Sequence, residues 1–180
     1  MVAVMPKLIY SMNVSLDGYM EDETGRFGWS RPDPEVHRFV NAEHRAAGGE
    51  IYGARMWETM QYWATAQGDD VTNEFAEVWQ AVPKYVASRS LAEVEHGATL
   101  LRDPAAEVAA LKEQDGGPLY VSGGELAAAL IDLVDEIDAY VYPVIVAGGK
   151  PAWKVPLALS LIDSRTFPSG VVFSRYDVKR

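Results

Sequence analysis

The sequence predicts a one-domain α/β protein whose sheet is largely parallel, with an antiparallel edge. Its 180 residues suit a single domain, and no linker or internal repeat divides them. Up to about residue 137, short runs rich in β-branched and aromatic residues alternate with helical segments. After that point, strands follow one another without helices between them. Alternating strands and helices form a parallel sheet, and consecutive strands add an antiparallel part.

Turn and capping residues in the sequence indicate where the first strand and the first helix begin and end. Residues 7–14 (KLIYSMNV) have a strand pattern, and the turn signal of residues 15–18 (SLDG) ends it. After a polar loop, Asp33-Pro34 combines an N-cap residue with a proline at the first helical position. We expect this helix to reach about residue 47, because Gly48-Gly49 then ends it.

The middle of the chain repeats this alternation. Asp103-Pro104 marks another helix start, and Leu126, Leu130 and Leu133 form one apolar face of a later helix. Strands are expected at 50–53, 84–88, 98–101 and 119–122, and helices at 54–62, 73–81, 104–114 and 125–134.

The last part of the chain is predicted to be β-structure. Residues 137–146 form a long β-rich run that Ala147-Gly148-Gly149 ends. Residues 157–167 and 171–178 follow, and Pro168-Ser169-Gly170 joins them. Two strand patterns with a short turn between them are typical of an antiparallel hairpin.

The composition excludes several functions. The chain has 16 Lys and Arg against 26 Asp and Glu, a formal net charge of −10, so nucleic acid and anionic membranes are poor partners. It has no cysteine, which excludes disulfides, cysteine-ligated zinc and a thiol nucleophile. Three histidines do not easily build a catalytic zinc site, although carboxylates could complete one, and we expect no metal. Without a signal peptide or a long apolar run, a soluble cytoplasmic protein is expected.

Gly123-Gly124 is the most informative motif, since it stands between a strand and a helix. The first-turn amides of a helix are unpaired and carry partial positive charge, so such a junction can bind a phosphate. The alternative is a tight turn without a ligand.

Gly53-Ala54-Arg55 is a second junction between a strand and a helix. A cation in the first helical turn is unfavourable unless an anionic ligand or a partner such as Glu58 offsets it.

Two further strand ends carry polar residues. Ser88-Arg89 offers a hydroxyl and a guanidinium, which suit a phosphate monoester, although a solvated strand end has the same composition. Asp17 is a candidate acid or hydrogen-bond acceptor for a substrate, or else only part of an Asp-Gly turn. In an open α/β sheet, the carboxyl ends of parallel strands share one binding site. The coincidence of these junctions therefore predicts a site there.

Other polar and aromatic residues have simpler interpretations. The spacing of His37, Asn41 and His44 predicts a solvated helix face, and residues 21–23 (EDE) predict a solvated loop. The five tryptophans are able to stack on a planar ligand, but buried packing is the commoner role of each.

The four junctions, in this order, resemble the dihydrofolate reductase superfamily. The likeness is closest to its branch related to the reductase domain of the bifunctional riboflavin-biosynthesis enzyme, the RibD C-terminal domain. The most specific segment is LYVSGGELAAALIDLVDEIDAYVYPVIVAGGKPAW, at residues 119–153. The resemblance covers nearly the whole chain and also includes residues 7–20, 51–60 and 84–91.

The resemblance implies a three-layer αβα fold with about eight strands and NADPH bound across the sheet. By resemblance, Gly53 and Arg55 match the segment at the adenosine and pyrophosphate end, and Ser88 and Arg89 match the 2′-phosphate loop. The pyrophosphate loop and helix start correspond to Gly123, Gly124, Glu125 and Leu126. The SLDG segment at residues 15–18 matches the loop beside the nicotinamide and substrate, and the residues expected to bind the substrate are Asn13, Ser15 and Asp17.

The chain also departs from these relatives. Dihydrofolate reductases carry an acidic residue on the first helix among apolar neighbours, whereas Glu35 and Glu43 do not lie in an apolar stripe here. The family's Gly-Arg-x-Thr is Gly53-Ala54-Arg55-Met56 in this chain, and the zinc signature of the riboflavin enzyme's deaminase half does not occur in these residues. Folate reduction and riboflavin synthesis are therefore not specifically predicted.

We expect an NADPH-dependent reductase that transfers a hydride to a C=N or C=O bond of a small pterin- or pyrimidine-like substrate. Asp17, or a water that it orients, would supply the proton. The alternatives are a reductase that uses flavin (FMN) on the same scaffold and a nucleotide-binding protein without catalysis. As relatives in this branch often pair, a homodimer is also expected, through residues 139–146 and the terminal hairpin.

Overall fold

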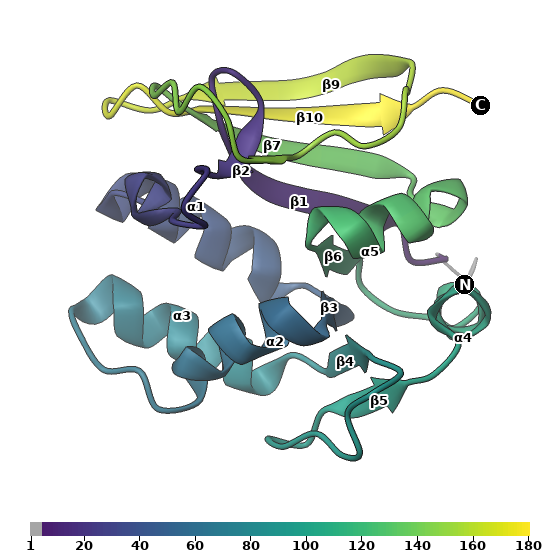
Figure 1. The fold of residues 1–180 in the computed structure, drawn as a ribbon. Helices are drawn as coiled ribbons and strands as arrows, with labels where there is room; N and C mark the ends of the chain where they lie inside the picture. Colours follow the sequence, from purple (N-terminus) through teal and green to yellow (C-terminus); the bar gives the residue numbers. More distant parts are fainter. Residues whose placement is uncertain (1–4) are drawn as a thin grey trace.

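The computed structural model describes residues 5–180 and confirms the predicted fold class. One mixed sheet of eight strands lies at its centre. These strands are β1 Leu8–Ser15, β3 Gly49–Gly53, β4 Lys84–Ala87, β5 Thr99–Leu101, β6 Leu119–Ser122, β7 Glu136–Tyr142, β9 Leu159–Thr166 and β10 Val172–Val178. Their order across the sheet is β5-β4-β3-β6-β1-β7-β10-β9 (Figure 1).

The strand directions define the edge at which a site can form. From β5 across to β7 every pairing is parallel, whereas β10 is antiparallel to both β7 and β9, which confirms the predicted hairpin. β7 ends at Tyr142 rather than at 146, because Pro143 follows and has no N–H for the ladder. The carboxyl ends of β4, β3, β6 and β1 therefore lie along one edge of the sheet.

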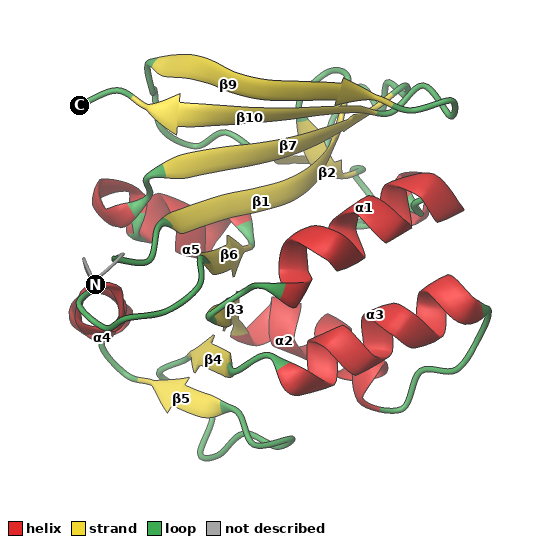
Figure 2. Cartoon of the chain, turned by 180° about the vertical axis from the view of Figure 1, so that it is seen from behind, coloured by secondary structure: helices red, strands yellow, loops and turns green. Residues whose placement is uncertain are grey.

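Helices cover both faces of the sheet, so the molecule has three layers (Figure 2). One face carries α1 Pro34–Arg45, α2 Ala54–Met60 and α3 Asp70–Ala81, and the other carries α4 Pro104–Lys112 and α5 Gly124–Ala129. The predicted cap of α1 is confirmed, because the Asp33 side chain accepts from the N–H groups of Glu35 and Val36. Between residues 5 and 180, no helix combines the length and the apolar character that crossing a membrane requires.

The predicted helix at 125–134 is divided into two pieces. α5 ends at Ala129, and a 3-10 turn follows at Ile131–Leu133. The N–H of Leu130 approaches the carbonyls of both Leu126 (3.0 Å) and Ala127 (3.2 Å), which is the tightening common at a helix end. The side chain of Leu130 is nevertheless buried in the core.

The core consists of three clusters, which explain where each helix lies. Beneath α4 and α5, β1 and β6 contribute Leu8 and Val121. Beneath α1, β7 and β10 contribute Tyr140 and Phe173. The cluster beneath α2 and α3 contains Tyr52, Trp57, Phe75, Trp79 and Val86. Full burial of an apolar side chain of this size stabilises the fold by about 1.5–3 kcal/mol.

The prediction of a solvated face on α1 is wrong. Asn41 and His44 are buried, and His37 is partly buried. The Asn41 amide donates to the Val71 carbonyl at 3.2 Å, and the His44 ring stacks on Tyr120 with their centroids 4.2 Å apart. α3 packs across α1 and covers Asn41, whereas His44 faces the sheet; the spacing within α1 reveals neither long-range contact.

A second, small sheet also lies outside the sequence prediction. β2 (Tyr19–Glu21) pairs with β8 (Lys150–Pro151), and strands this short carry no detectable periodicity. Gly149 has φ +123°, and a Cβ there would lie 2.0 Å from the Glu21 carbonyl oxygen, so the approach requires glycine. Glu21 is part of this sheet and its side chain is 16% exposed, so the prediction of a solvated loop is wrong there.

Candidate active site

Three of the predicted junctions meet at one edge of the sheet. In the parallel ladder, Gly53 at the end of β3 pairs with Ala87 at the end of β4, and the residue before Gly53 pairs with Ser122 at the end of β6. Gly53, Ser88 and Gly123 therefore leave three neighbouring strands at nearly the same level.

β1 extends beyond these three strands. Tyr10 pairs with Val121, close to the end of β6, whereas β1 continues to Ser15. This is an extension of about four residues, or roughly 13 Å, past β6. Asn13 lies on the extension, and its side chain is exposed although β1 lies between β6 and β7 in the sheet. Asn13 is thus reachable from solvent beside the three shorter strand ends.

Two helix starts at this edge have no side-chain cap. Gly53 is the N-cap of α2 and Gly123 is the N-cap of α5, and no side chain among residues 5–180 caps the first turn of either helix. A Cβ added at either glycine would meet no heavy atom within 4 Å. Both backbones are therefore open to an approaching ligand, and the first-turn amides can receive an anion.

The residues after Gly123 have different surroundings. Gly124 is buried, and a Cβ there would lie 2.9 Å from the Met20 Cε atom. The Leu126 side chain packs against the core, so only its backbone amide faces this edge. Glu125 is exposed and forms an ion pair with Lys154, whose hydrogen bond lowers the pKa of Glu125. Glu125 is therefore an anion beside the proposed phosphate position.

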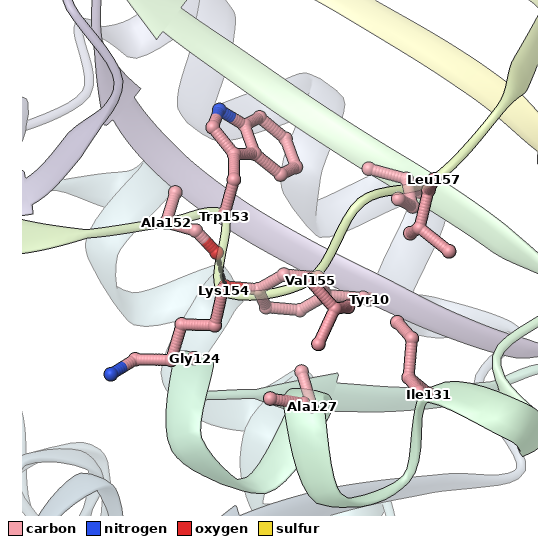
Figure 3. A pocket seen from close by; sticks show the side chains of 11 residues that line it. Tyr10, Gly124, Ala127, Ile131, Ala152, Trp153, Lys154, Val155 and Leu157 are labelled. Atoms are coloured by element: carbon pink, nitrogen blue, oxygen red, sulfur yellow. Dashed lines mark hydrogen bonds between the residues drawn. The ribbon is translucent and has the colours of Figure 1, made fainter.

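A small hollow lies behind Gly124, on the α5 side of the sheet (Figure 3). Figure 3 shows that Ala127 of α5 and Ile131 of the following 3-10 turn face the segment from Ala152 to Leu157 across it. The Tyr10 hydroxyl donates to the Ala152 carbonyl at 3.1 Å and holds this segment against the sheet. The hollow measures about 10 Å³, which is room for one water molecule. The hollow is therefore too small to hold a nucleotide.

Arg55 has a partner that the sequence did not suggest. Its Nη2 donates to Oε2 of Glu21 at 2.8 Å, so the expected alternative pairing with Glu58 is wrong. Lys150 Nζ lies 3.9 Å from the other oxygen of Glu21. The Arg55 side chain is 68% exposed, so it remains accessible to a ligand at the start of α2.

The loop after β4 is organised by an arginine that the sequence analysis missed. Arg102 donates to the carbonyls of Ser88 at 2.9 Å and Leu91 at 2.7 Å. The Ser88 hydroxyl accepts from the N–H of Leu91 at 3.1 Å. Arg89 is exposed and forms no ion pair within the part of the chain that the structure describes. Its guanidinium is thus available at the rim of a fixed loop.

Asp17 ties the turn after β1 to a distant loop. Its carboxylate accepts from Ser15 Oγ at 2.7 Å and from the N–H groups of Val146 and Ala147 at 3.2 and 2.8 Å. The hydrogen bond from Ser15 lowers the pKa of Asp17 the most, and the two backbone bonds lower it further. Asp17 is therefore ionised at neutral pH. An ionised carboxylate accepts hydrogen bonds and has no proton to give. The Ser15 side chain is buried and occupied by this turn, so it offers no hydroxyl to a substrate.

The fold and this edge define a dihydrofolate reductase-like α/β protein. The chain belongs to the family of the RibD C-terminal domain, whose model matches residues 6–173. The resemblance to the RibD C-terminal domain, predicted from the sequence, is therefore confirmed.

The chain is similar to the following three proteins over nearly its whole length. It is 30% identical over 176 residues to the uncharacterized protein YyaP of Bacillus subtilis (strain 168), covering 92% of both chains. A putative riboflavin biosynthesis protein from Shewanella sp. PV-4 superimposes with a TM-score of 0.73 at 24% identity, over 97% of this chain and 99% of that one. Dihydrofolate reductase from Enterococcus faecalis, complexed with NADP(H), superimposes with a TM-score of 0.65 at 10% identity, over 99% of this chain and 100% of that one. At these identities, the two structures show the fold alone.

Proposed function

We propose that the protein is a reductase that uses NADPH to transfer a hydride to a C=N or C=O bond of a small pterin- or pyrimidine-like heterocycle. The observation that carries this proposal is the meeting of two uncapped, glycine-led helix starts at the ends of neighbouring strands. Such starts are general sites for phosphate groups, and a dinucleotide has several. Membership of the RibD C-terminal domain family supports the same reading.

The residues present fit NADPH. The backbone of Gly53 and the amides of Gly123, Gly124, Glu125 and Leu126 would hold the pyrophosphate. For the 2′-phosphate and the adenosine end, the chain offers these side chains: Ser88, Arg89 and Arg55. The nicotinamide supplies the hydride when the cofactor is bound, while the protein binds and orients both reactants.

The substrate would bind beside the extension of β1. The Asn13 amide donates to the Ser30 carbonyl at 3.2 Å, so its Oδ1 atom is left to accept a hydrogen bond from a heterocycle N–H. Asp17 would act as an ionised acceptor that orients a water or fixes the loop at Val146 and Ala147. In this arrangement the proton comes from the oriented water rather than from the carboxylate itself.

Turnover tests the proposal. The protein is mixed with NADPH and a panel of pterins and pyrimidines, and the loss of absorbance by the reduced nicotinamide of NADPH is followed. Native mass spectrometry of the purified protein identifies any cofactor that it retains. Oxidation of NADPH with one of the heterocycles supports the reductase. Bound FMN would favour the flavin alternative, and NADPH binding without turnover on any substrate would favour a nucleotide-binding protein without catalysis.

We also propose that two chains form a homodimer through β9. The expected interface at residues 139–146 is wrong for its strand part, because β7 is paired on both sides. Within the part of the chain that the structure describes, β9 pairs on one side only, and Leu161 and Ile162 on it are 58% and 51% exposed. An edge strand with exposed apolar side chains is stabilised by pairing with a second copy.

A further inference from the structure

Arg102 stands directly after β5, the strand at one edge of the sheet, and its side chain is exposed. Among residues 5–180 it forms no ion pair. Its guanidinium instead donates to two backbone oxygens, Nη1 to the Ser88 carbonyl at 2.9 Å and Nη2 to the Leu91 carbonyl at 2.7 Å. Carbonyls carry no net charge, so the positive charge of Arg102 stays uncompensated in a chain whose formal net charge is −10.

The two bonds from Arg102 close a short turn after β4. The Ser88 hydroxyl accepts from the N–H groups of Ser90 at 3.3 Å and Leu91 at 3.1 Å, and the Ser88 N–H donates to the Leu101 carbonyl at 3.2 Å. The turn is thus held from within by its own hydroxyl and from outside by β5 and Arg102. A planar guanidinium presents its donors in a fixed fork, whereas a lysine is a flexible point charge that does not match two carbonyls in this geometry.

The bond to the Ser88 carbonyl also sets the orientation of Arg89. The C=O and N–H of a trans peptide group point in opposite directions, so the Arg89 N–H points away from Arg102. Within the described part of the chain, this N–H donates no hydrogen bond, and the Arg89 side chain is exposed. Arg89 therefore presents a backbone donor and a guanidinium on one residue, both available to a ligand.

The rest of the loop between β4 and β5 is held as well. Leu91 and Val94 pack against the apolar cluster beneath α2 and α3. His96 and Gly97 turn the chain back towards β5 with φ values of 55° and 68°. A loop that is ordered before its ligand arrives loses little conformational entropy on binding, so the position of Arg89 is set in advance.

We propose that Arg102 is a positioning residue that sets the preference for NADPH over NADH, because it holds the turn from which Arg89 reaches the 2′-phosphate. The inference rests on the proposed NADPH-dependent function and adds to it a residue that determines cofactor choice. Arg102 acts in two ways. It fixes the turn through the two carbonyls, and it places a second positive charge beside Arg89. A 2′-phosphate gains from both, whereas the 2′-hydroxyl of NADH gains little from either.

Fluorescence titrations of the folded full chain with NADPH and with NADH test the proposal. Arg102→Gln removes the charge and the fork, and it should weaken NADPH binding roughly tenfold while NADH binding stays within about twofold. Arg102→Lys keeps the charge but not the fork, and it should weaken NADPH binding by only about threefold. Arg38→Gln is the matched control, since Arg38 is exposed on α1 and forms no ion pair among residues 5–180. It should change neither affinity.

A double-mutant cycle shows whether Arg102 acts through Arg89. In the Arg89→Ala background, Arg102→Gln should weaken NADPH binding clearly less than it does in the wild-type protein, because the side chain that it positions is gone.

The outcomes separate this role from the reductase proposal. An equal loss of NADPH and NADH affinity in Arg102→Gln, an unchanged NADPH affinity, or fully additive losses in the cycle would overturn the role of Arg102 and leave the NADPH site standing. Absence of saturable NADPH binding by the folded wild-type protein would overturn the reductase proposal, and the role of Arg102 with it.

Discussion

Arg55 at the start of α2 donates to the carboxylate of Glu21 in β2, and this ion pair joins the small β2–β8 sheet to the edge where the cofactor is proposed to bind. The carboxylate offsets a cation that the helix dipole would otherwise disfavour. A phosphate group could serve Arg55 in the same way, so Glu21 and an anionic ligand compete for one guanidinium.

Glu21→Gln is therefore expected to tighten NADPH binding. The substitution removes a negative charge next to the ligand and releases Arg55, which for an exposed pair is worth up to about 1 kcal/mol, or roughly fivefold. Fluorescence titration with NADPH measures this change in affinity. Glu58→Gln, on the same helix but not paired with Arg55, should leave the affinity unchanged. Weaker binding by Glu21→Gln would show that the carboxylate organises the site rather than competes at it.

Arg89→Ala should weaken NADPH binding far more than NADH binding, because only NADPH carries the 2′-phosphate. Loss of a charge-assisted contact costs about 1.5–3 kcal/mol, or roughly 10- to 150-fold in affinity. Competition titrations of both cofactors provide the measurement, and Arg89→Lys should retain part of the preference. Equal affinities of the wild-type protein for the two cofactors would rule out a 2′-phosphate site at Ser88 and Arg89.

Asp17→Asn should lower turnover while NADPH still binds. The amide has one acceptor oxygen and no charge, so it cannot hold Ser15 and both loop amides as the carboxylate does. A loss of ~10² or more in rate is expected if the residue takes part in proton handling. Ser15→Ala is the companion variant. It removes the strongest cause of the lowered pKa of Asp17, so any acid limb of the pH–rate profile should move to higher pH.

Two results would contradict this role of Asp17. Unchanged turnover in Asp17→Asn would leave the residue as a turn former, since Asn suits the same backbone. If NADPH binding is lost together with turnover, Asp17 instead stabilises the whole edge of the sheet where the strands end. Kcat and the NADPH dissociation constant must therefore be measured on the same preparation.

Stability should depend on pH through His44. Burial alone lowers the pKa of His44, but the charge and hydrogen bond of Glu50, with Asp138 and Glu43 nearby, outweigh it and raise the pKa. A raised pKa in the folded state gives stability that is complete below the unfolded value of about 6.5 and is lost as pH rises through the folded value. His44→Gln should cost about 3 kcal/mol or more at pH 6, because it leaves Glu50 buried without its partner.

Urea unfolding at pH 6 and at pH 9 measures this effect. The difference between wild type and His44→Gln should shrink as the pH rises, because the folded chain loses the proton of His44 as the pH passes through its raised pKa. Arg45→Gln, next in sequence but in an exposed pair with Glu74, is the control and should change little at either pH. A gap between wild type and His44→Gln that is constant with pH would contradict a charged His44.

The dimer proposal makes a simple prediction. Light scattering should give the mass of two chains for the wild-type protein and of one chain for Ile162→Lys, since a charge on the edge strand blocks pairing. Leu16→Lys changes an apolar residue elsewhere that is even more exposed than Ile162, and it should leave the dimer intact. A wild-type mass of one chain at micromolar concentration would contradict the proposal.

The sequence predicts the features of this protein that are set by local signals. Asp33-Pro34 caps α1, and Gly123 begins α5 after β6. Both follow from backbone preferences of a few neighbouring residues. The order of such signals, read as a family resemblance, also predicts the edge at which Gly53 and Ser88 meet.

Features that depend on distant contacts could not be predicted. Glu21 finds Arg55 only because β2 pairs with β8, whose two residues have no strand signature. His44 is buried because it meets Glu50 of β3 and stacks on Tyr120 of β6, and the role of Arg102 depends on carbonyls eleven or more residues earlier. In each case, hydrophobic periodicity and turn chemistry describe one segment, whereas the contact is set by how two segments pack.

Binding of NADPH to the wild-type protein tests the central claim most directly. A titration followed by nicotinamide fluorescence is predicted to show one saturable site per chain, with NADPH preferred over NADH. Gly123→Ala should abolish or strongly weaken this binding in a folded protein, because φ of +102° disfavours a side chain at the start of α5. Absence of saturable NADPH binding by the folded wild-type protein would contradict the account.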